Sequence, residues 1–254
     1  MRFLLTNDDG IYAPGLAAIK AELEKIGQVT VIAPITEQSA VGHSITIADP
    51  LRVQEIRRGG EFYGYGLSGS PADCVKLGIS CLMTEAPDVV VSGINRGENV
   101  GVNVLYSGTV SAATEALVLG YKALALSVNS YMKPNYQTAA GFGARLAERL
   151  AGIAGALPFA LNVNCPSLEP EAVKGVKLTH QGQSRFVDSF VKREDPRGNV
   201  YYWQAGLTQI LDDDPLTDAV CLRDGYISVT PIDFRLGVNG GAYREDLEGL
   251  LSGL

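Results

Sequence analysis

Residues that bind transition metals or carry out redox chemistry are scarce in this chain. It has only two histidines and four cysteines. Zinc sites and dithiol redox centres are marked by closely spaced cysteine or histidine pairs, and none is formed by Cys74, Cys81, Cys165 and Cys221. We expect reduced, structural thiols, because free cysteine usually behaves as a small buried hydrophobic residue.

Positive charge is also scarce. The 21 Lys and Arg residues are outnumbered by 28 Asp and Glu residues, which gives a net charge of −7. Nucleic-acid backbones are bound mainly by clustered Lys and Arg, so this balance argues against a nucleic-acid polymer as partner. A small phosphorylated ligand is compatible with the net negative charge, since a divalent cation can bridge phosphate and carboxylate groups.

Long hydrophobic runs are missing as well. No apolar stretch approaches the roughly 20 residues that a membrane-spanning helix needs. The first residues, Met-Arg-Phe-Leu-Leu, lack the basic region, apolar region and cleavage site of a signal peptide. We therefore expect a cytoplasmic protein with no membrane partner.

The overall composition is typical of a folded protein: 46% of the 254 residues are hydrophobic and 19% are charged. Strand and helix patterns alternate through its first half, which predicts a parallel sheet with helices on both faces. We expect strands at 2–5, 29–33, 87–91 and 123–128, helices at 14–26, 70–83 and 109–119, and a hairpin within 44–66. The predicted fold class is α/β, with a Rossmann-like, doubly wound and mostly parallel sheet.

The second half of the chain is less regular. We expect helices at 135–153 and 243–251 and strands at 159–164, 176–179 and 226–231. Residues 183–216 form a polar, broken segment, and connections of that length are usually functional or engaged with a partner. The chain is therefore divided into a Rossmann-like catalytic core at 1–182 and an irregular C-terminal extension at 183–254, within one domain overall. We expect this extension to contain an arm or hairpin, the last strand and the last helix, and to be used in oligomerisation.

Two adjacent carboxylates follow the first predicted strand. Asp8 and Asp9 lie in the segment Asn-Asp-Asp-Gly, between that strand and the first predicted helix. Ligands of parallel α/β sheets bind at the carboxyl ends of the strands, and carboxylate oxygens suit hard divalent cations. The alternative is a simple turn, because Asn, Asp and Gly are common turn residues.

Two further oxygen-bearing side chains follow neighbouring predicted strands. They are Ser39 and Asn95, and each taken alone is equally well explained as a turn or cap residue. If the strands are neighbours, Asp8, Asp9, Ser39 and Asn95 converge into an oxygen-only set that suits Mg²⁺ or Mn²⁺.

A possible phosphate site follows at Ser107-Gly108-Thr109, a turn that leads into a helix of small residues. The N-terminus of a helix offers backbone N–H groups and a positive dipole end to an anion. Routine helix capping by Ser and Thr is the alternative.

One histidine lies near this group of residues. His43 is a candidate proton donor to the leaving oxygen, although loop histidines more often make structural hydrogen bonds. The acidic run Asp212 to Asp214 is better explained as a solvated loop than as a second metal site.

The ordered motifs resemble those of the SurE family, whose members are metal-dependent nucleoside monophosphate phosphatases. The resemblance covers nearly the whole chain. Its motifs are Asn7-Asp8-Asp9-Gly10, Gln38-Ser39 with Gly42-His43-Ser44-Ile45-Thr46, Gly69 to Val75, Ser92-Gly93-Ile94-Asn95 with Gly97, Asn99 and Gly101, Tyr106 to Val110, Thr179 to Gly182, Thr217-Asp218 and Gly225 to Pro231.

The resemblance implies a 5′-nucleotidase that in some members also acts on 3′-nucleotides and short polyphosphate. It places one cation per subunit on Asp8, Asp9, Ser39 and Asn95. It also implies phosphate contacts by the Asn95, Asn99 and Ser107 to Thr109 region, and a homodimer or homotetramer with exchanged C-terminal segments. The chain departs from the common family pattern at Ala116, after Glu115, and at His180, which leaves substrate preference open.

The mechanism expected from these residues is hydrolysis of a phosphomonoester by a metal-activated water. Asp8 or Asp9 orients or deprotonates the water, and Asn95 helps to stabilise the transition-state oxygens. An aspartyl-phosphate intermediate is the minority alternative. A receiver-like, Mg²⁺-binding signalling module without phosphatase activity is the alternative function, whereas a dinucleotide-binding oxidoreductase lacks its Gly-x-Gly-x-x-Gly fingerprint here.

Overall fold

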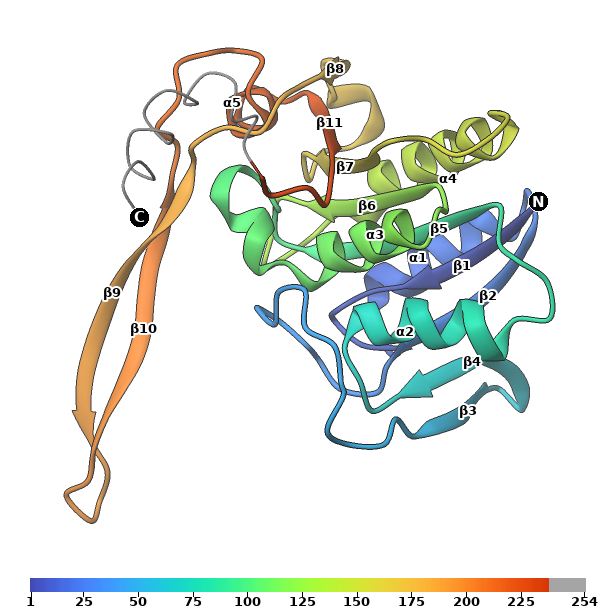
Figure 1. The fold of residues 1–254 in the computed structure, drawn as a ribbon. Coiled ribbons are helices and arrows are strands. Elements are labelled where there is room, and N and C mark those ends of the chain that lie inside the picture. The colour runs from blue at the N-terminus through green and yellow to red at the C-terminus, as the bar shows by residue number, and fades with distance from the viewer. Residues whose placement is uncertain (238–254) are drawn as a thin grey trace, which may run out of the picture.

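A nine-stranded sheet forms the centre of the protein. It is seen in a computed structural model that describes residues 1–237 (Figure 1). The strand order is β3-β4-β2-β1-β5-β6-β7-β11-β8. The main parallel strands are β1 (Arg2–Thr6), β2 (Gln28–Pro34), β5 (Val89–Arg96), β6 (Ala123–Val128) and β7 (Ala160–Cys165). This arrangement confirms the predicted α/β class.

The edges of the sheet depart from the parallel pattern. On one side β4 (Glu61–Leu67) is parallel to β2, and β3 (Val53–Arg58) is antiparallel to β4. On the other side β11 (Ile227–Ile232) is antiparallel to β7 and parallel to β8 (Val176–Leu178). The C-terminal part of the described chain therefore completes the main sheet.

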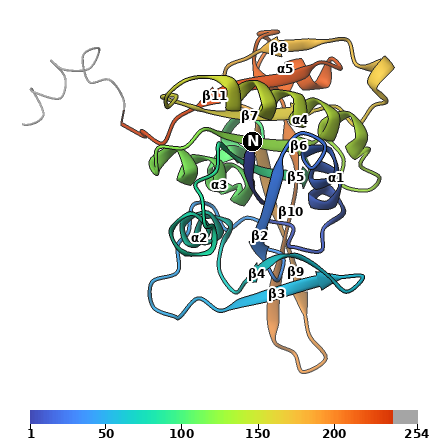
Figure 2. The ribbon, with the colours of Figure 1, turned by 90° about the vertical axis from the view of Figure 1, so that its right-hand side faces the viewer.

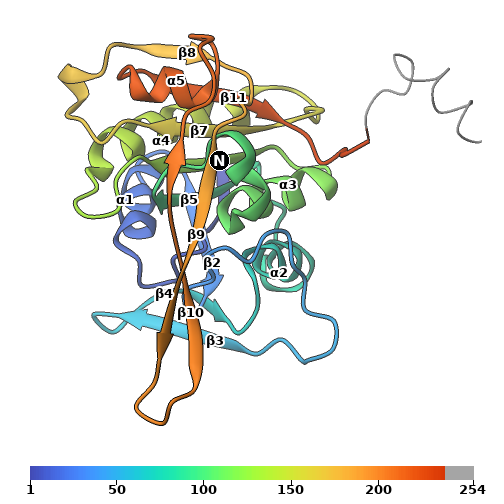
Figure 3. The ribbon, with the colours of Figure 1, turned by 90° about the vertical axis from the view of Figure 1, so that its left-hand side faces the viewer.

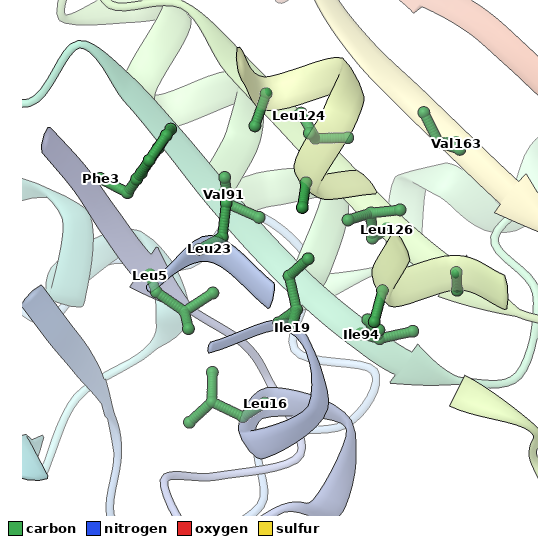
Figure 4. Packing of buried hydrophobic residues seen from close by; sticks show 14 of the residues in the cluster. Phe3, Leu5, Leu16, Ile19, Leu23, Val91, Ile94, Leu124, Leu126 and Val163 are labelled. Carbon is green, nitrogen blue, oxygen red and sulfur yellow. The ribbon is translucent and has the colours of Figure 1, made fainter. Parts of the chain in front are cut away.

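Helices cover both faces of the sheet (Figure 2). On one face α1 (Pro14–Leu23) and α4 (Tyr136–Gly152) bury apolar side chains against the strands, as Leu16, Ile19 and Leu126 illustrate (Figure 4). The opposite face is covered by α2 (Pro71–Leu77) and α3 (Gly108–Val118). Since both faces are covered, the central strands are apolar throughout rather than alternating.

A long hairpin stands apart from the main sheet. Its strands β9 (Arg185–Glu194) and β10 (Val200–Gln209) pair antiparallel over ten residues each, and we call this hairpin the arm. The arm projects beside the carboxyl ends of the parallel strands and extends past β4 and β3 (Figures 1 and 3). The polar segment in which an arm or hairpin was expected thus holds a hairpin, which is regular because its strands pair with each other.

Several predicted boundaries were wrong by a few residues. The helix predicted at 70–83 ends as an α-helix at Leu77 and continues as a π-turn, η1 (Gly78–Leu82). The third parallel strand extends to Arg96, so Asn95 lies on β5 rather than on a loop. Shorter elements complete the chain: the 3₁₀ turns η2 (Gly101–Tyr106) and η3 (Pro170–Ala172), and α5 (Asp218–Arg223). The helix predicted at 243–251 lies outside the described residues.

None of the helices within residues 1–237 is both long and apolar enough to span a membrane.

A capping box begins helix α2 and also holds the loop that follows Ser39. The Ser70 hydroxyl accepts a hydrogen bond from the Asp73 backbone N–H, and the Asp73 carboxylate accepts one from the Ser70 N–H. The same carboxylate accepts hydrogen bonds from the backbone N–H of Thr46 at 3.0 Å and from its hydroxyl at 2.7 Å. Burial acts to raise the pKa of Asp73, but these hydrogen bonds outweigh it and lower the pKa below its usual value.

We expect Asp73→Asn to lower the free energy of unfolding by about 1–2 kcal/mol at pH 7, as the loss of a cap does. Because the pKa is lower in the folded state, the stabilisation is present above the unfolded-state pKa of about 4 and is lost as the pH falls through the folded-state pKa. Urea unfolding at a fixed protein concentration measures both effects. The control is Asp49→Asn, at an exposed aspartate of the same loop; equal losses in the two variants would contradict the assignment.

Candidate active site

The carboxylate of Asp8 is fixed by the first turn of α3. Asp8 is 5% exposed. Its Oδ1 accepts a hydrogen bond from the Thr109 hydroxyl at 2.5 Å, and its Oδ2 accepts one from the Thr109 backbone N–H at 3.0 Å. The loop after β1 is therefore joined to the N-terminus of α3, and the two predicted sites form one.

Gly108 permits this close approach. A Cβ atom at position 108 would lie 2.8 Å from the Cβ of Asp8 and 3.0 Å from its Oδ2. Separations this short do not occur between real side chains, so any larger residue would displace Asp8 or α3. The close packing against Asp8 therefore explains the glycine at position 108, which was predicted as part of a phosphate-binding turn.

Asp9 lies beside Asp8 and faces the end of β5. Its Oδ2 accepts a hydrogen bond from the backbone N–H of Arg96 at 3.2 Å. Burial, together with the charge of Asp8, raises the pKa of Asp9 to about 6, while Arg96 opposes the shift. Burial also raises the pKa of Asp8, against the hydrogen bonds from Thr109. A buried carboxylate beside a half-buried one favours a cation between them, because the cation removes their mutual repulsion.

The loop that carries Ser39 and the end of strand β5 that carries Asn95 meet the same pair of aspartates. The Gln38 backbone N–H donates to the carbonyl oxygen of Asp8 at 2.7 Å, which places the loop of Ser39 against the loop that follows β1. Asn95 directly precedes Arg96, whose backbone binds Asp9. The convergence of three strand ends follows from the parallel order β2-β1-β5.

The donor set fits a hard divalent cation. The Asn95 amide group donates from Nδ2 to the Gly97 carbonyl at 2.8 Å, and the Ser39 hydroxyl donates to Glu37 at 2.7 Å. Both residues thereby keep an oxygen acceptor for a ligand. The described residues contain no group of three or more His, Cys, Asp or Glu side chains that would hold a metal. A site here would rest on two carboxylates, a hydroxyl and an amide oxygen, which suits Mg²⁺ or Mn²⁺ rather than Zn²⁺.

The hydroxyl groups of the Ser107-Gly108-Thr109 turn serve the protein itself. Ser107 is the N-cap of α3, and its hydroxyl oxygen accepts a hydrogen bond from the Val110 N–H at 3.1 Å. Its hydroxyl proton remains a donor for an anion. The Thr109 hydroxyl donates to Asp8, so Thr109 positions a carboxylate.

Asn99 lies in a buried network of amide groups. Its backbone N–H donates to the Asn164 side chain at 2.8 Å, and its own Nδ2 donates to the Ser127 hydroxyl at 2.9 Å. The Asn99 carbonyl accepts hydrogen bonds from the side chains of Asn162 and Asn164. Asn99 thus anchors the loop between β5 and α3 to strands β6 and β7.

His43 is held by helix α3. Its Nε2 lies 2.7 Å from Glu115 Oε2, and its Nδ1 lies 3.3 Å from the Thr114 hydroxyl. Glu115 is 5% exposed, and its other oxygen accepts a hydrogen bond from Lys76 of α2 at 2.9 Å. Both ring nitrogens therefore face helix α3, and sequence analysis missed the roles of Glu115 and Lys76 because they lie on helices far from His43 in the sequence.

We expect Gly108→Ala to weaken Mn²⁺ binding and to lower the free energy of unfolding by about 1–3 kcal/mol, because the new methyl group overlaps Asp8. Isothermal titration and urea unfolding measure the two effects. Gly152→Ala is the matched control, since a Cβ at the end of α4 has no neighbour within 4 Å. Similar Mn²⁺ affinities and similar free energies of unfolding in the two variants would contradict the proposed overlap of the new methyl group with Asp8.

Comparisons with known proteins place the chain in a family. Residues 3–188 match the family model described as survival protein SurE. A protein named 5′-nucleotidase SurE from Syntrophobacter fumaroxidans is 51% identical over 91% of this chain and 93% of its own length. A protein of the same name from Desulforamulus reducens is 44% identical over 99% of both chains.

Solved structures give the same result. The crystal structure of the SurE protein from Aquifex aeolicus superposes with a TM-score of 0.82 at 36% identity, covering 98% of this chain and 100% of that one. The match extends beyond the core to the C-terminal segment. The chain belongs to the SurE family.

Proposed function

We propose that this protein is a divalent-metal-dependent 5′-nucleotidase, which hydrolyses nucleoside 5′-monophosphates to nucleoside and phosphate. The observation that carries the proposal is the contact of Asp8, which adjoins Asp9, with the N-terminus of α3, because paired carboxylates suit a cation and a helix N-terminus suits an anion. The relatives named 5′-nucleotidase SurE support the same activity. A cytoplasmic location is part of the proposal.

One cation per subunit, Mg²⁺ or Mn²⁺, would be held by Asp8, Asp9, Ser39 and Asn95. Bound there, such an ion lowers the pKa of a coordinated water and neutralises phosphate charge. Asn95, with Ser107 and Gly108 at the start of α3, orients the phosphate group and stabilises negative charge on its oxygens. Thr109, predicted as a further phosphate contact, instead holds Asp8 in place, since its N–H and its hydroxyl both donate to that carboxylate. Asn99 fixes the loop that leads to α3 and completes the phosphate site.

Asp9 is the better candidate to orient or deprotonate the attacking water. Its Oδ2 accepts a hydrogen bond from the Arg96 N–H, and among the described residues no hydrogen bond is found to its Oδ1, so this oxygen is available to a water. Both oxygens of Asp8 already accept hydrogen bonds from Thr109, which makes Asp8 a poor nucleophile. This geometry favours direct hydrolysis over an aspartyl-phosphate intermediate.

Phosphate release tests the proposed activity. We expect release from nucleoside 5′-monophosphates with Mg²⁺ or Mn²⁺ and none after chelation, with slower release from 3′-monophosphates and short polyphosphate. Asp8→Asn should lower kcat by at least about 100-fold, as removal of a group that stabilises the transition state does. Asp88→Asn, which changes an aspartate hydrogen-bonded to Arg2 at the start of β1, should leave kcat unchanged.

Failure of the wild type to release phosphate from any nucleotide would overturn the proposal. Metal binding without phosphate release would instead favour the receiver-like signalling alternative.

We propose that His43 holds the loop of Ser39 in place and is not the proton donor. Its ring nitrogens are paired with Glu115 and Thr114, so proton transfer would require one of these contacts to break. A glutamine side chain can place its Nε2 close to the position of the histidine Nε2 and keep the bond to Glu115.

We therefore expect His43→Gln to keep most of the wild-type kcat and His43→Ala to lose activity, because only the alanine variant releases the loop. His180→Gln, at the only other histidine, is the control. The test is to measure kcat across pH for the three variants. Equal losses of kcat in the glutamine and alanine variants would assign the proton-donor role to His43.

We also propose that the protein forms a homodimer or homotetramer, in which the arm contacts a second copy of the chain and C-terminal segments are exchanged. Support comes from one face of the arm, where Val191 lies opposite Trp203 and Val187 lies opposite Leu207. Trp203 is 61% exposed and Leu207 is 78% exposed. An exposed apolar face of this kind is typical of an interaction surface.

Trp203→Glu should therefore dissociate the assembly into smaller species, because a charge would be buried at the contact. Analytical ultracentrifugation gives the masses. Tyr202→Glu places the same charge on the opposite face of β10, at a side chain as exposed as Trp203 and paired with Lys192, and should leave the assembly intact. A monomeric wild type, or an unchanged Trp203→Glu assembly, would exclude this role of the arm.

A further inference from the structure

We propose that Asp218 is a positioning residue for the phosphate site, acting through the turn η2 that leads into Ser107. The inference rests on the proposed nucleotidase function and adds a residue that lies outside the metal and phosphate contacts. It is carried by the hydrogen bonds that join Asp218, the base of the arm and η2.

Asp218 is a fully buried carboxylate shared by three segments. It is 0% exposed. Its Oδ2 accepts a hydrogen bond from the Gly101 N–H at 2.8 Å, and its Oδ1 accepts hydrogen bonds from the N–H groups of Gly182 at 3.0 Å and Ala219 at 2.8 Å. One side chain at the start of α5 therefore holds the first residue of η2 and the segment that leads into the arm.

The charge of Asp218 is balanced by backbone groups. No ion pair found among residues 1–237 includes it. Burial raises its pKa, and the three backbone hydrogen bonds oppose that shift. A buried carboxylate of this kind requires its N–H donors to stay in place, so it fixes their positions.

The base of the arm supports the same turn. The Val102 N–H donates to the Ser184 carbonyl at 2.8 Å, and the Gln181 side chain donates to the Gly101 carbonyl at 2.9 Å. A Cβ atom on Gly101 would lie only 2.1 Å from the Ser184 carbonyl oxygen. Glycine is therefore needed at position 101, and η2 has little freedom to shift against the arm.

The far end of η2 contacts both halves of the candidate active site. Tyr106, its last residue, directly precedes Ser107, the N-cap of α3. The Tyr106 carbonyl also accepts a hydrogen bond from the Gly42 N–H at 3.0 Å, within the loop that runs from Ser39 to His43. A displacement at Gly101 would therefore reach the phosphate turn through six residues of 3₁₀ helix.

Asp218→Asn tests this role with little change of volume. The amide group of asparagine turns one acceptor into a donor that faces a backbone N–H. The hydrogen bond from Gly101 is lost when the nitrogen takes the place of Oδ2, which costs one bond where the place of Oδ1 would cost two. We expect about a tenfold rise in KM for a nucleoside monophosphate and in the inhibition constant of inorganic phosphate. The dissociation constant of Mn²⁺ should change less than threefold, because the hydrogen bonds from Thr109 to Asp8 remain.

Asp212→Asn is the matched control. The Asp212 carboxylate accepts hydrogen bonds from the Gln183 N–H at 2.8 Å and the Ser184 hydroxyl at 3.3 Å, so it holds the base of the arm through other bonds than Asp218. We expect less than a twofold change in KM. Hydrogen exchange should be faster at the backbone amides of residues 101–107 in Asp218→Asn only.

Gln181→Leu provides a second variant in case Asp218→Asn does not fold. It removes the side-chain hydrogen bond to Gly101 from a half-exposed position, and it should raise KM two- to fivefold. Unchanged KM and phosphate inhibition in the folded variants, despite faster exchange at 101–107, would overturn the positioning role. Wild-type protein that releases no phosphate would overturn the proposed function itself, which is a different outcome.

Discussion

The hydrogen bonds between Asp8 and Thr109 are the interaction on which the rest of the site depends. They join residues 101 positions apart in the sequence and set the loop after β1 against the N-terminus of α3. A carboxylate and a helix N-terminus attract each other, since the helix dipole and its N–H groups favour negative charge. The same attraction sets the loop that we propose binds a cation beside the turn that we propose binds the phosphate.

Buried carboxylates join the loops around this centre. Asp73 holds Thr46 at the start of α2, Glu115 holds His43 and Lys76, and Asp218 holds Gly101 and Gly182. A buried carboxylate is stabilised only when donors surround it, so each one gathers N–H groups from several segments. The sheet supplies the strand ends, and these contacts keep the irregular loops between them in a single arrangement.

The fold was predictable from the sequence because its central strands and helices have strong local patterns. The apolar runs of β1, β5 and β6 read as buried parallel strands, and the structure confirms them. An arm or hairpin was predicted in the polar segment after Gln183, but the bounds of its strands were not, since these strands acquire regular structure by pairing with each other. The end of α2 was misplaced because the apolar pattern continues through the π-turn.

The sequence by itself determined which chemical groups follow the strands: Asp8 and Asp9, Ser39, and Asn95. It determined these groups because the succession of strands along the chain, and the side chains that follow each strand, can be recognised from short segments. Only the tertiary structure decided what each group touches, such as Thr109 for Asp8 and helix α3 for His43. The physical reason is that these partners lie 71 to 101 positions apart, and a local pattern carries no information about contacts made across the folded chain.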